Sequence, residues 1–308
     1  MVFSSESGLV DLVDGPDGVW VDHRLSNSGP THLYFISSDG QREDRTPAGL
    51  SGEPHIFPGR SGGVTWVWDG RTVRRWEGGA WSDWTASEPG VSQVYAAFED
   101  RAWYREGSDW VSDDGMGRPF SVPIRGEDGQ KAFAADGALH LLSKDGTQYL
   151  RYDEELGDEQ ARLTLFEGVV LRKVFGVSAQ GLCVWTGMSF RAPSEATVGC
   201  VVGDNWQPLE VPGPSEGRNV RHLISASGTG RDDVWILTND MLAESTESGY
   251  ALYGAQIFML EHYDGVEWSV VERIEQADGL LHRESLASAG RGVAFLDVDG
   301  AVRRYRAE

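Results

Sequence analysis

The chain has 308 residues, of which 40% are hydrophobic, so it is long and apolar enough to bury a sizeable core. Its formal net charge of -21 argues against nucleic acid and anionic membranes as partners, because both require clustered Lys and Arg. The acidity indicates either a solvated surface or a cationic partner.

The sequence contains no membrane or export signal as written. No run approaches the roughly 18 apolar residues of a membrane helix. The start, Met1–Val10, lacks the basic and apolar regions of a signal peptide. We therefore expect a cytoplasmic protein, or a secreted or periplasmic one if a leader has been trimmed.

Short runs of alternating, β-branched and aromatic residues, parted by Gly and Asp-Gly turns, indicate an all-β chain. We expect about seven repeats of a four-stranded antiparallel meander. The strands expected in the first three repeats are Leu9–Val13, Gly18–Val21, His32–Ile36 and a polar stretch from Gln41; His55–Phe57, Gly63–Trp68, Thr72–Trp76 and Ala80–Trp84; Val94–Phe98, Ala102–Tyr104, Asp109–Val111 and Pro119–Val122.

The next three repeats follow the same pattern. Their expected strands are Ala132–Ala134, Ala138–Leu142, Gln148–Tyr152 and Ala161–Phe166; Val174–Val177, Leu182–Trp185, Val198–Val202 and Trp206–Val211; Val220–Ala226, Asp233–Leu237, Gln256–Tyr263 and Val266–Val271. In the sixth repeat, Asp264-Gly265 is a strong hairpin signal because Gly accepts positive φ without steric penalty.

The last expected repeat has three strands, Ser285–Ala287, Val293–Leu296 and Ala301–Tyr305. The first residues, Met1–Ser5, have no partner in their own repeat. We expect them to supply the missing strand, which joins the two ends of the chain and removes two exposed sheet edges. The whole chain, residues 1–308, is then one domain.

Tryptophans recur at matching places in these repeats. The second strands carry Val19-Trp20, Thr65-Trp66, Val184-Trp185 and Val234-Trp235, and a Gly-x-x-Trp turn enters the fourth strand at 78–81, 203–206 and 265–268. Residues 107–110 have the same spacing but fall one strand early.

With these repeats the whole chain resembles a β-propeller of about seven blades. Trp68-Asp69 is the only Trp-Asp pair, so the WD40 subfamily is not indicated. The recurring Arg, Glu and Trp set of fucose-binding propellers is also absent from the sequence. We expect the repeated tryptophans to pack the blades rather than to act as ligand platforms.

The resemblance implies that the first strand of each blade lines a central channel and opens onto one face. The polar residues at that position are Asp11, His55, Gln93, Lys131, Lys173, His222 and Arg283, with Arg172 and Arg221 adjacent. Lys144 is the only lysine elsewhere. These residues form either a mouth that binds an anion or a wet channel lined by solvating groups.

Two connections are longer than the others, at 187–196 and at Asn239–Ala255. Long loops in compact domains are often functional. The second carries Asp240, Glu244, Glu247, Tyr250 and Tyr253. It is either a lid or partner-contact loop, to which Tyr250 and Tyr253 would contribute, or a tolerated insertion.

The cysteines and histidines predict no metal site and no cofactor. Cys183 and Cys200 lie on neighbouring strands and fit a cross-strand disulfide, but we expect two buried thiols. The seven histidines show no metal-ligand spacing, and His23, His32, His140 and His262 are expected to be structural. The Asp-Gly pairs are explained by turn chemistry without calcium.

The sequence favours a monomeric, non-catalytic scaffold that presents one face to a protein or a small anionic ligand. Two alternatives stay open. In a propeller lyase, hydrolase or isomerase, the residues that act as general acid–base or oxyanion-stabilising groups would be Lys131, Lys173, His55 and His222. A lectin would instead bind sugars on exposed tryptophans between blades.

Overall fold

The computed structural model describes twenty segments of the chain. They are residues 9–15, 18–24, 30–50, 53–59, 64–86, 93–106, 109–114, 120–125, 131–135, 138–143, 148–153, 158–165, 170–178, 181–187, 197–203, 205–246, 249–276, 286–288, 292–296 and 302–306. Within these segments no helix has the length and hydropathy needed to cross a bilayer. The chain divides into two compact units, one of them holding the strands from Leu9 to Thr164.

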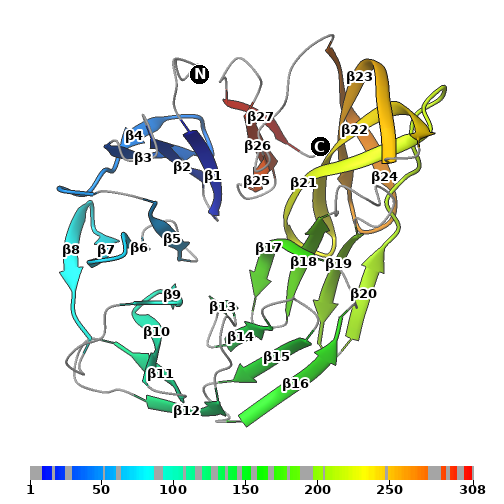
Figure 1. The fold of residues 1–308 in the computed structure, drawn as a ribbon. Helices are drawn as coiled ribbons and strands as arrows, with labels where there is room; N and C mark the ends of the chain where they lie inside the picture. Colours follow the sequence, from blue (N-terminus) through cyan, green and yellow to red (C-terminus); the bar gives the residue numbers. More distant parts are fainter. Residues whose placement is uncertain are drawn as a thin grey trace. The chain divides into compact units, whose positions relative to one another are not determined.

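This first unit contains four four-stranded antiparallel sheets (Figure 1). Their strands are β1 (Leu9–Gly15), β2 (Gly18–Arg24), β3 (Thr31–Ser37), β4 (Arg42–Asp44); β5 (His55–Pro58), β6 (Thr65–Trp68), β7 (Val73–Glu77), β8 (Ala80–Trp84); β9 (Ala96–Phe98), β10 (Arg101–Glu106), β11 (Asp109–Asp113), β12 (Phe120–Arg125); β13 (Lys131–Ala135), β14 (Ala138–Leu142), β15 (Gln148–Asp153) and β16 (Asp158–Thr164). The sheets follow one another in chain order, and β5 contacts both β1 and β9.

The second unit holds two further four-stranded sheets and one of three strands. Their strands are β17 (Val170–Ser178), β18 (Gly181–Gly187), β19 (Thr197–Val202), β20 (Asn205–Leu209); β21 (Val220–Gly230), β22 (Asp233–Thr246), β23 (Gly249–Tyr263), β24 (Trp268–Gln276); β25 (Leu286–Ser288), β26 (Gly292–Leu296) and β27 (Val302–Arg306). Here β21 contacts both β18 and β25.

The prediction of seven four-stranded blades is wrong. The described segments form six blades of four strands, and the sheet β25–β27 has three. The expected closing strand, Met1–Ser5, lies outside the described residues. The error came from dividing the chain length by a typical blade length, although blade sizes here are unequal: β22 and β23 have 14 and 15 residues, whereas β9 has three.

The repeated tryptophans pack and link the blades, as predicted. Trp20, Trp66 and Trp235 on the second strands are fully buried. On the fourth strands, Trp81 Nε1 donates to the Arg45 carbonyl at 2.7 Å and Trp268 Nε1 donates to the Glu210 carbonyl at 2.9 Å. Both carbonyls lie on the segment that enters the blade, so each indole fastens a blade to its own entry segment.

The Asp-Gly turns form through local hydrogen bonds. Asp264 Oδ1 accepts from the backbone N–H of Val266 and of Glu267, both at 2.9 Å, and Gly265 has a φ of 96°. Asp69 is bonded in the same way to the two residues that follow Gly70. These carboxylates are engaged by backbone donors, which is the turn chemistry expected from the sequence.

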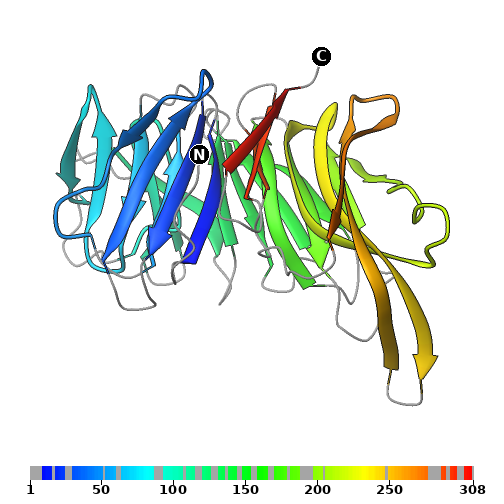
Figure 2. The same ribbon diagram turned by 90° about the horizontal axis from the view of Figure 1, so that it is seen from above.

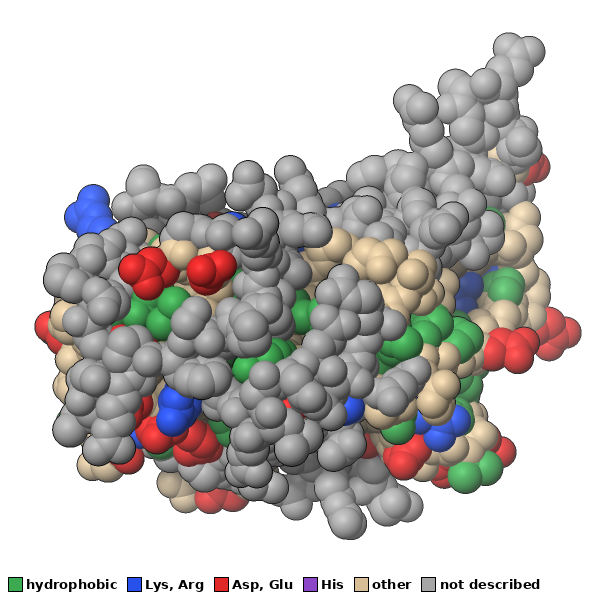
Figure 3. Space-filling view, turned by 90° about the horizontal axis from the view of Figure 1, so that it is seen from below, with side chains coloured by type: hydrophobic (Ala, Val, Ile, Leu, Met, Phe, Trp, Pro, Cys, Tyr) green, Lys and Arg blue, Asp and Glu red, His purple; other side chains and the backbone are tan. Residues whose placement is uncertain are grey.

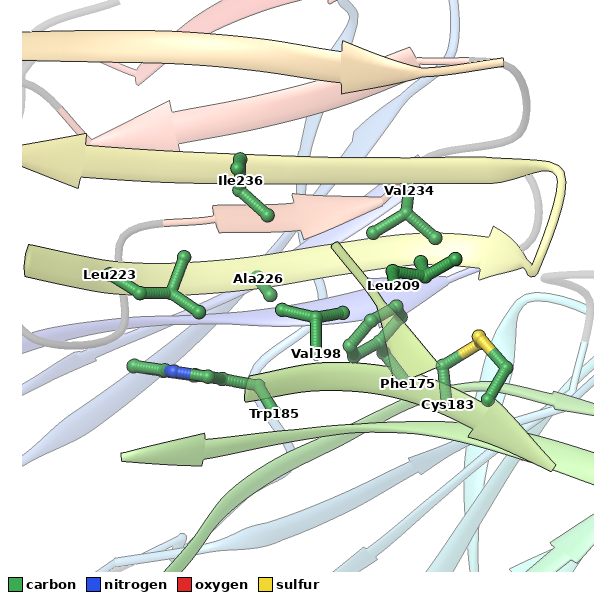
Figure 4. Close-up of a cluster of buried hydrophobic side chains, with 10 residues drawn as sticks. Phe175, Cys183, Trp185, Val198, Leu209, Leu223, Ala226, Val234 and Ile236 are labelled. Carbon is green, nitrogen blue, oxygen red and sulfur yellow. A yellow bond between two sulfur atoms is a disulfide. The ribbon is translucent and has the colours of Figure 1, made fainter. Parts of the chain in front are cut away.

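A core cluster joins the sheet β17–β20 to the sheet β21–β24. Figure 4 shows side chains from both sheets meeting, among them Phe175, Trp185, Leu223 and Ile236. All four belong to the second unit. Their burial holds these two blades together through apolar contact.

Cys183 and Cys200 form a disulfide within this cluster, so the prediction of two free thiols is wrong. The two residues are direct partners in the antiparallel pair β18–β19, with Cα atoms 4.0 Å apart. Each is only 1% exposed. The register alone brings the sulfurs together, because opposite residues of an antiparallel pair project to the same side of the sheet.

Candidate functional site

The residues predicted to line the channel mouth divide between the two units. Asp11, His55, Gln93 and Lys131 belong to the first unit, and Arg172, Lys173, Arg221 and His222 belong to the second. Arg283 lies outside the described residues. The ring as a whole therefore stays a prediction, and each member is described in its own unit.

In the first unit, His55 and Lys131 are exposed at the starts of β5 and β13, and Gln93 is half-buried just before β9. The His55 ring stacks on Trp68, with ring centroids 5.0 Å apart. Although much of the side chain is exposed, the atoms packed around the rest of the ring desolvate it and lower the pKa of His55, which favours the neutral ring at pH 7.

In the second unit, Lys173 is half-buried and its Nζ donates to the Leu286 carbonyl at 2.7 Å. This bond ties β17 to β25. His222 is half-buried on β21, and burial lowers its pKa. The neighbouring Arg172 is exposed.

Arg221 is held by two buried carboxylates. Its Nε and Nη2 donate to Oδ1 and Oδ2 of Asp240 at 2.7 and 2.8 Å, and its Nη1 donates to Oε1 and Oε2 of Glu261 at 3.1 and 2.9 Å. Asp240 is 0% exposed and Glu261 is 3% exposed. Because the guanidinium fork is filled by this bidentate geometry, its charge is compensated within the blade.

We call Arg221, Asp240 and Glu261 the triad, and the pKa values of its two acids shift in opposite directions. Burial works against ionisation of all three groups, but the hydrogen bonds and charges of the two carboxylates raise the pKa of Arg221. Burial alone would raise the pKa of Asp240, but the hydrogen bonds from Arg221 and Ser215 and the charge of Arg221 together outweigh it and lower this pKa. At Glu261 burial prevails and raises its pKa. One cation thus faces two acids, and Glu261 is the one that binds a proton more readily.

The triad sits where the blade changes from four strands to two. β21 pairs with β22 as far as Val220↔Met241, and β24 pairs with β23 as far as Gln276↔Gln256. Beyond that point β22 and β23 pair with each other from Leu242↔Tyr253 to Thr246↔Gly249. We call residues 242–246 and 249–253 the ribbon. Figure 2 shows both strands running on past β21 and β24.

The prediction of a long loop at Asn239–Ala255 is therefore wrong. Its residues continue the two strands, with one register shift between Asp240 and Leu242. Of the residues predicted there, Asp240 is buried in the triad, Glu244 is exposed, and the backbones of Tyr250 and Tyr253 lie on β23. Glu247 lies outside the described residues.

The other predicted long loop, at 187–196, lies beyond Gly187 outside the described residues. The polar residues predicted along the first strands therefore stay a prediction, since Arg283 lies outside the described residues and the others divide between the two units. What the second unit shows instead is a blade with an unusual outline. Its features are the ribbon, the triad at the ribbon's base, and the outer strand β24.

β24 exposes apolar side chains that the sequence analysis did not single out as a site. It is the last strand in the order β21-β22-β23-β24. Val270 and Val271 on this strand are 56% and 38% exposed, and Val266 in the preceding turn is 84% exposed. Among the described residues only Val202 is a further large exposed hydrophobic side chain. An exposed apolar edge strand is a place where another chain can pair.

No family model and no curated protein matches the sequence. Solved structures do. A streptogramin B lyase is similar with a TM-score of 0.53 and 10% identity, over 99% of this chain and 94% of that one. Virginiamycin B lyase from Staphylococcus aureus, in a catalytically inactive form with quinupristin, is similar with a TM-score of 0.54 and 13% identity, over 99% and 97%.

A third similar structure is the β-propeller domain of Myceliophteria thermophila Cps50 (Swd1), with a TM-score of 0.56 and 10% identity over 100% of this chain and 99% of that one. At such identities the likeness concerns the fold alone. Together with the consecutive four-stranded antiparallel sheets, it shows that this chain has a β-propeller fold.

Proposed function

We propose that this β-propeller is a non-catalytic scaffold that binds a protein partner through the blade β21–β24. The observation that carries the proposal is the pairing register. In the described part of the chain, the ribbon strands pair only with each other, beyond the reach of β21 and β24. A two-stranded ribbon is marginally stable in water, so its retention favours a role in contact.

A protein partner fits this blade better than a small anion. The guanidinium of Arg221 is compensated by Asp240 and Glu261, which leaves that position with an excess of negative charge. The amine of Lys173 is bonded to a backbone carbonyl. Lys173 was a member of the predicted anion site and Arg221 lay beside it, and both have structural partners.

The edges of the blade offer a means of recognition. Edge strands present backbone N–H and C=O groups to which an extended segment of another chain can add. Val266, Val270 and Val271 add apolar surface beside the outer edge of β24. The partner segment that suits this edge is extended and carries apolar side chains.

Charge defines the partner further. The chain has a net charge of -21, and residues 239–255 include three acidic and no basic residues, namely Asp240, Glu244 and Glu247. Asp and Glu side chains also lie at several separate places on the face in Figure 3. Complementary charge speeds association and excludes wrong partners, so we expect basic residues in the partner segment.

The experiment compares four tagged proteins as baits in lysate from the source cells. They are the native chain, a shortened form in which Asn-Gly replaces residues 242–255, the double variant Val270→Lys/Val271→Lys, and Val202→Lys as the matched control. Asn-Gly suits a two-residue hairpin turn between Met241 and Gln256. Captured proteins are identified by mass spectrometry, purified and titrated against each bait.

We expect one partner with a basic, extended segment to bind the native chain and Val202→Lys equally. The shortened form and the double variant should each bind it at least about tenfold more weakly, a loss of about 1.4 kcal/mol. Equal affinity for all four baits would refute this assignment of the surface. Circular dichroism of each bait confirms that a loss of binding is not a loss of fold.

A further inference from the structure

Two histidines face each other on the first blade. His23 on β2 and His32 on β3 are direct partners in the antiparallel register, and both are half-buried. Opposite residues project to the same side of a sheet with Cβ atoms about 4.5–5.5 Å apart. Two imidazoles at that separation can both reach one metal ion, since metal–nitrogen distances are about 2.0–2.1 Å.

The His32 ring has a fixed position and an unused nitrogen. It stacks on Tyr34 with ring centroids 6.1 Å apart and an interplanar angle of 10°. Its Nδ1 is buried, and among the described residues this nitrogen has no hydrogen-bond partner. Buried polar atoms almost always have a partner, so an unpartnered imidazole nitrogen beside a second imidazole points to a missing ligand.

The two rings also interact electrostatically. Burial, and then the charge of His32 and of Arg42, lower the pKa of His23. On the outer strand β4, Asp44 interacts electrostatically with His32 and contributes negative charge nearby.

We propose that His23 and His32 form a binding site for a divalent transition-metal ion, with water completing the coordination. Among the described residues no group of three or more His, Cys, Asp or Glu side chains is placed to hold a metal, so the protein supplies two ligands. Imidazole nitrogens favour the later first-row metals, and Cu²⁺ binds most tightly in that series.

The site contains one group that opposes a cation. Arg42 lies over the Tyr34 ring, 3.6 Å from its centroid, and its charge acts on both His23 and Asp44. Removing this charge should therefore strengthen metal binding, whereas removing either histidine should weaken it. A purely structural histidine pair would show neither effect.

The test uses the full chain, purified without an affinity tag and titrated with Cu²⁺ at pH 7. The variants are His23→Gln, His32→Gln, Arg42→Gln and, as a control on another blade, His140→Gln, whose side chain is fully buried. Isothermal titration gives the affinity, and electron paramagnetic resonance reports the nitrogen ligands of bound Cu²⁺.

We expect the native chain to bind one Cu²⁺ with two nitrogen ligands. Each of His23→Gln and His32→Gln should weaken binding at least about tenfold, because losing even an outer partner of a ligand costs that much. Arg42→Gln should bind more tightly, and His140→Gln should match the native chain. Binding that is absent, or unchanged in both histidine variants, would overturn the proposal.

Discussion

At the scale of single residues, Arg221 compensates the charge of two carboxylates that are buried in its blade. Asp240 on β22 and Glu261 on β23 are almost completely buried, and both accept hydrogen bonds from the one guanidinium on β21. Breaking a buried ion pair from one side is costly because it strands the remaining charge. The triad therefore fixes three neighbouring strands at the base of the ribbon.

Replacing Arg221→Met tests this cost. We expect the free energy of unfolding to fall by about 3–5 kcal/mol, measured by urea denaturation at pH 7. The control is Arg231→Met, whose partner Asp232 is 77% exposed, and which should cost about 0–1 kcal/mol. Equal losses in the two variants would contradict a structural role for the triad.

His140 provides a pH test at the same scale. Burial, followed by the charge of Arg151, lowers its pKa from 6.5 to about 3. Between pH 6.5 and 3 the unfolded chain binds a proton that the folded chain does not, so this contribution is complete above pH 6.5 and declines as pH falls. The decline is at most about 1.4 kcal/mol per pH unit.

His140→Gln should remove that component. Urea denaturation at pH 7 and pH 5 should show a smaller loss of stability in the variant than in the native chain. Gln retains a hydrogen-bonding group for the Tyr149 hydroxyl, which lies 2.8 Å from His140 Nδ1. Parallel pH profiles would show that His140 titrates normally in the folded protein.

At the scale of elements, the pair β18–β19 is closed by the disulfide between Cys183 and Cys200. The double variant Cys183→Ala/Cys200→Ala should lose about 2–4 kcal/mol of stability, the usual range for a bridge of this modest sequence separation. A reductant should destabilise the native chain by a similar amount and leave the variant unaffected. Two reactive thiols in the unfolded, unreduced protein would contradict the bridge.

The ribbon should be the least protected hydrogen-bonded part of its blade. Amides of Leu242 and Thr246 have a partner strand on one side only, whereas Ile236 and Leu237 are fully buried between two strands. Local stability follows burial and pairing, so we expect faster hydrogen exchange in the ribbon. Uniform exchange along β22 would show that the ribbon packs against something further.

Sequence patterns predicted these elements with uneven success. Buried strands with tryptophan, such as Asp233–Leu237, were predicted as short apolar runs between turn signals, because burial on both faces of a strand selects apolar residues at every position. The ribbon was not, because residues 239–255 were interpreted as a loop between two shorter strands. The valines of β24 were interpreted as part of an ordinary strand. Their exposure depends on β24 being the outermost strand of its sheet, which the local sequence does not reveal.

At the scale of the whole molecule, the repeated strand and tryptophan pattern carried the resemblance to a β-propeller, and the solved structures confirm that fold. The number of four-stranded blades was predicted wrongly, because length divided by a typical repeat ignores unequal strands. The predicted ring of polar residues depended on the placement of one blade against the next. The pairing register of strands predicts which side chains are neighbours within a blade, but it does not predict which side chains of different blades meet.

Hydrogen exchange of the complex with the captured partner tests the central claim most directly. We predict that partner binding slows exchange in the ribbon and along β24 around Val270 and Val271, while amides of the first unit keep their rates. Protection confined to other blades, with the ribbon and β24 unchanged, would contradict the assignment of this blade as the binding surface.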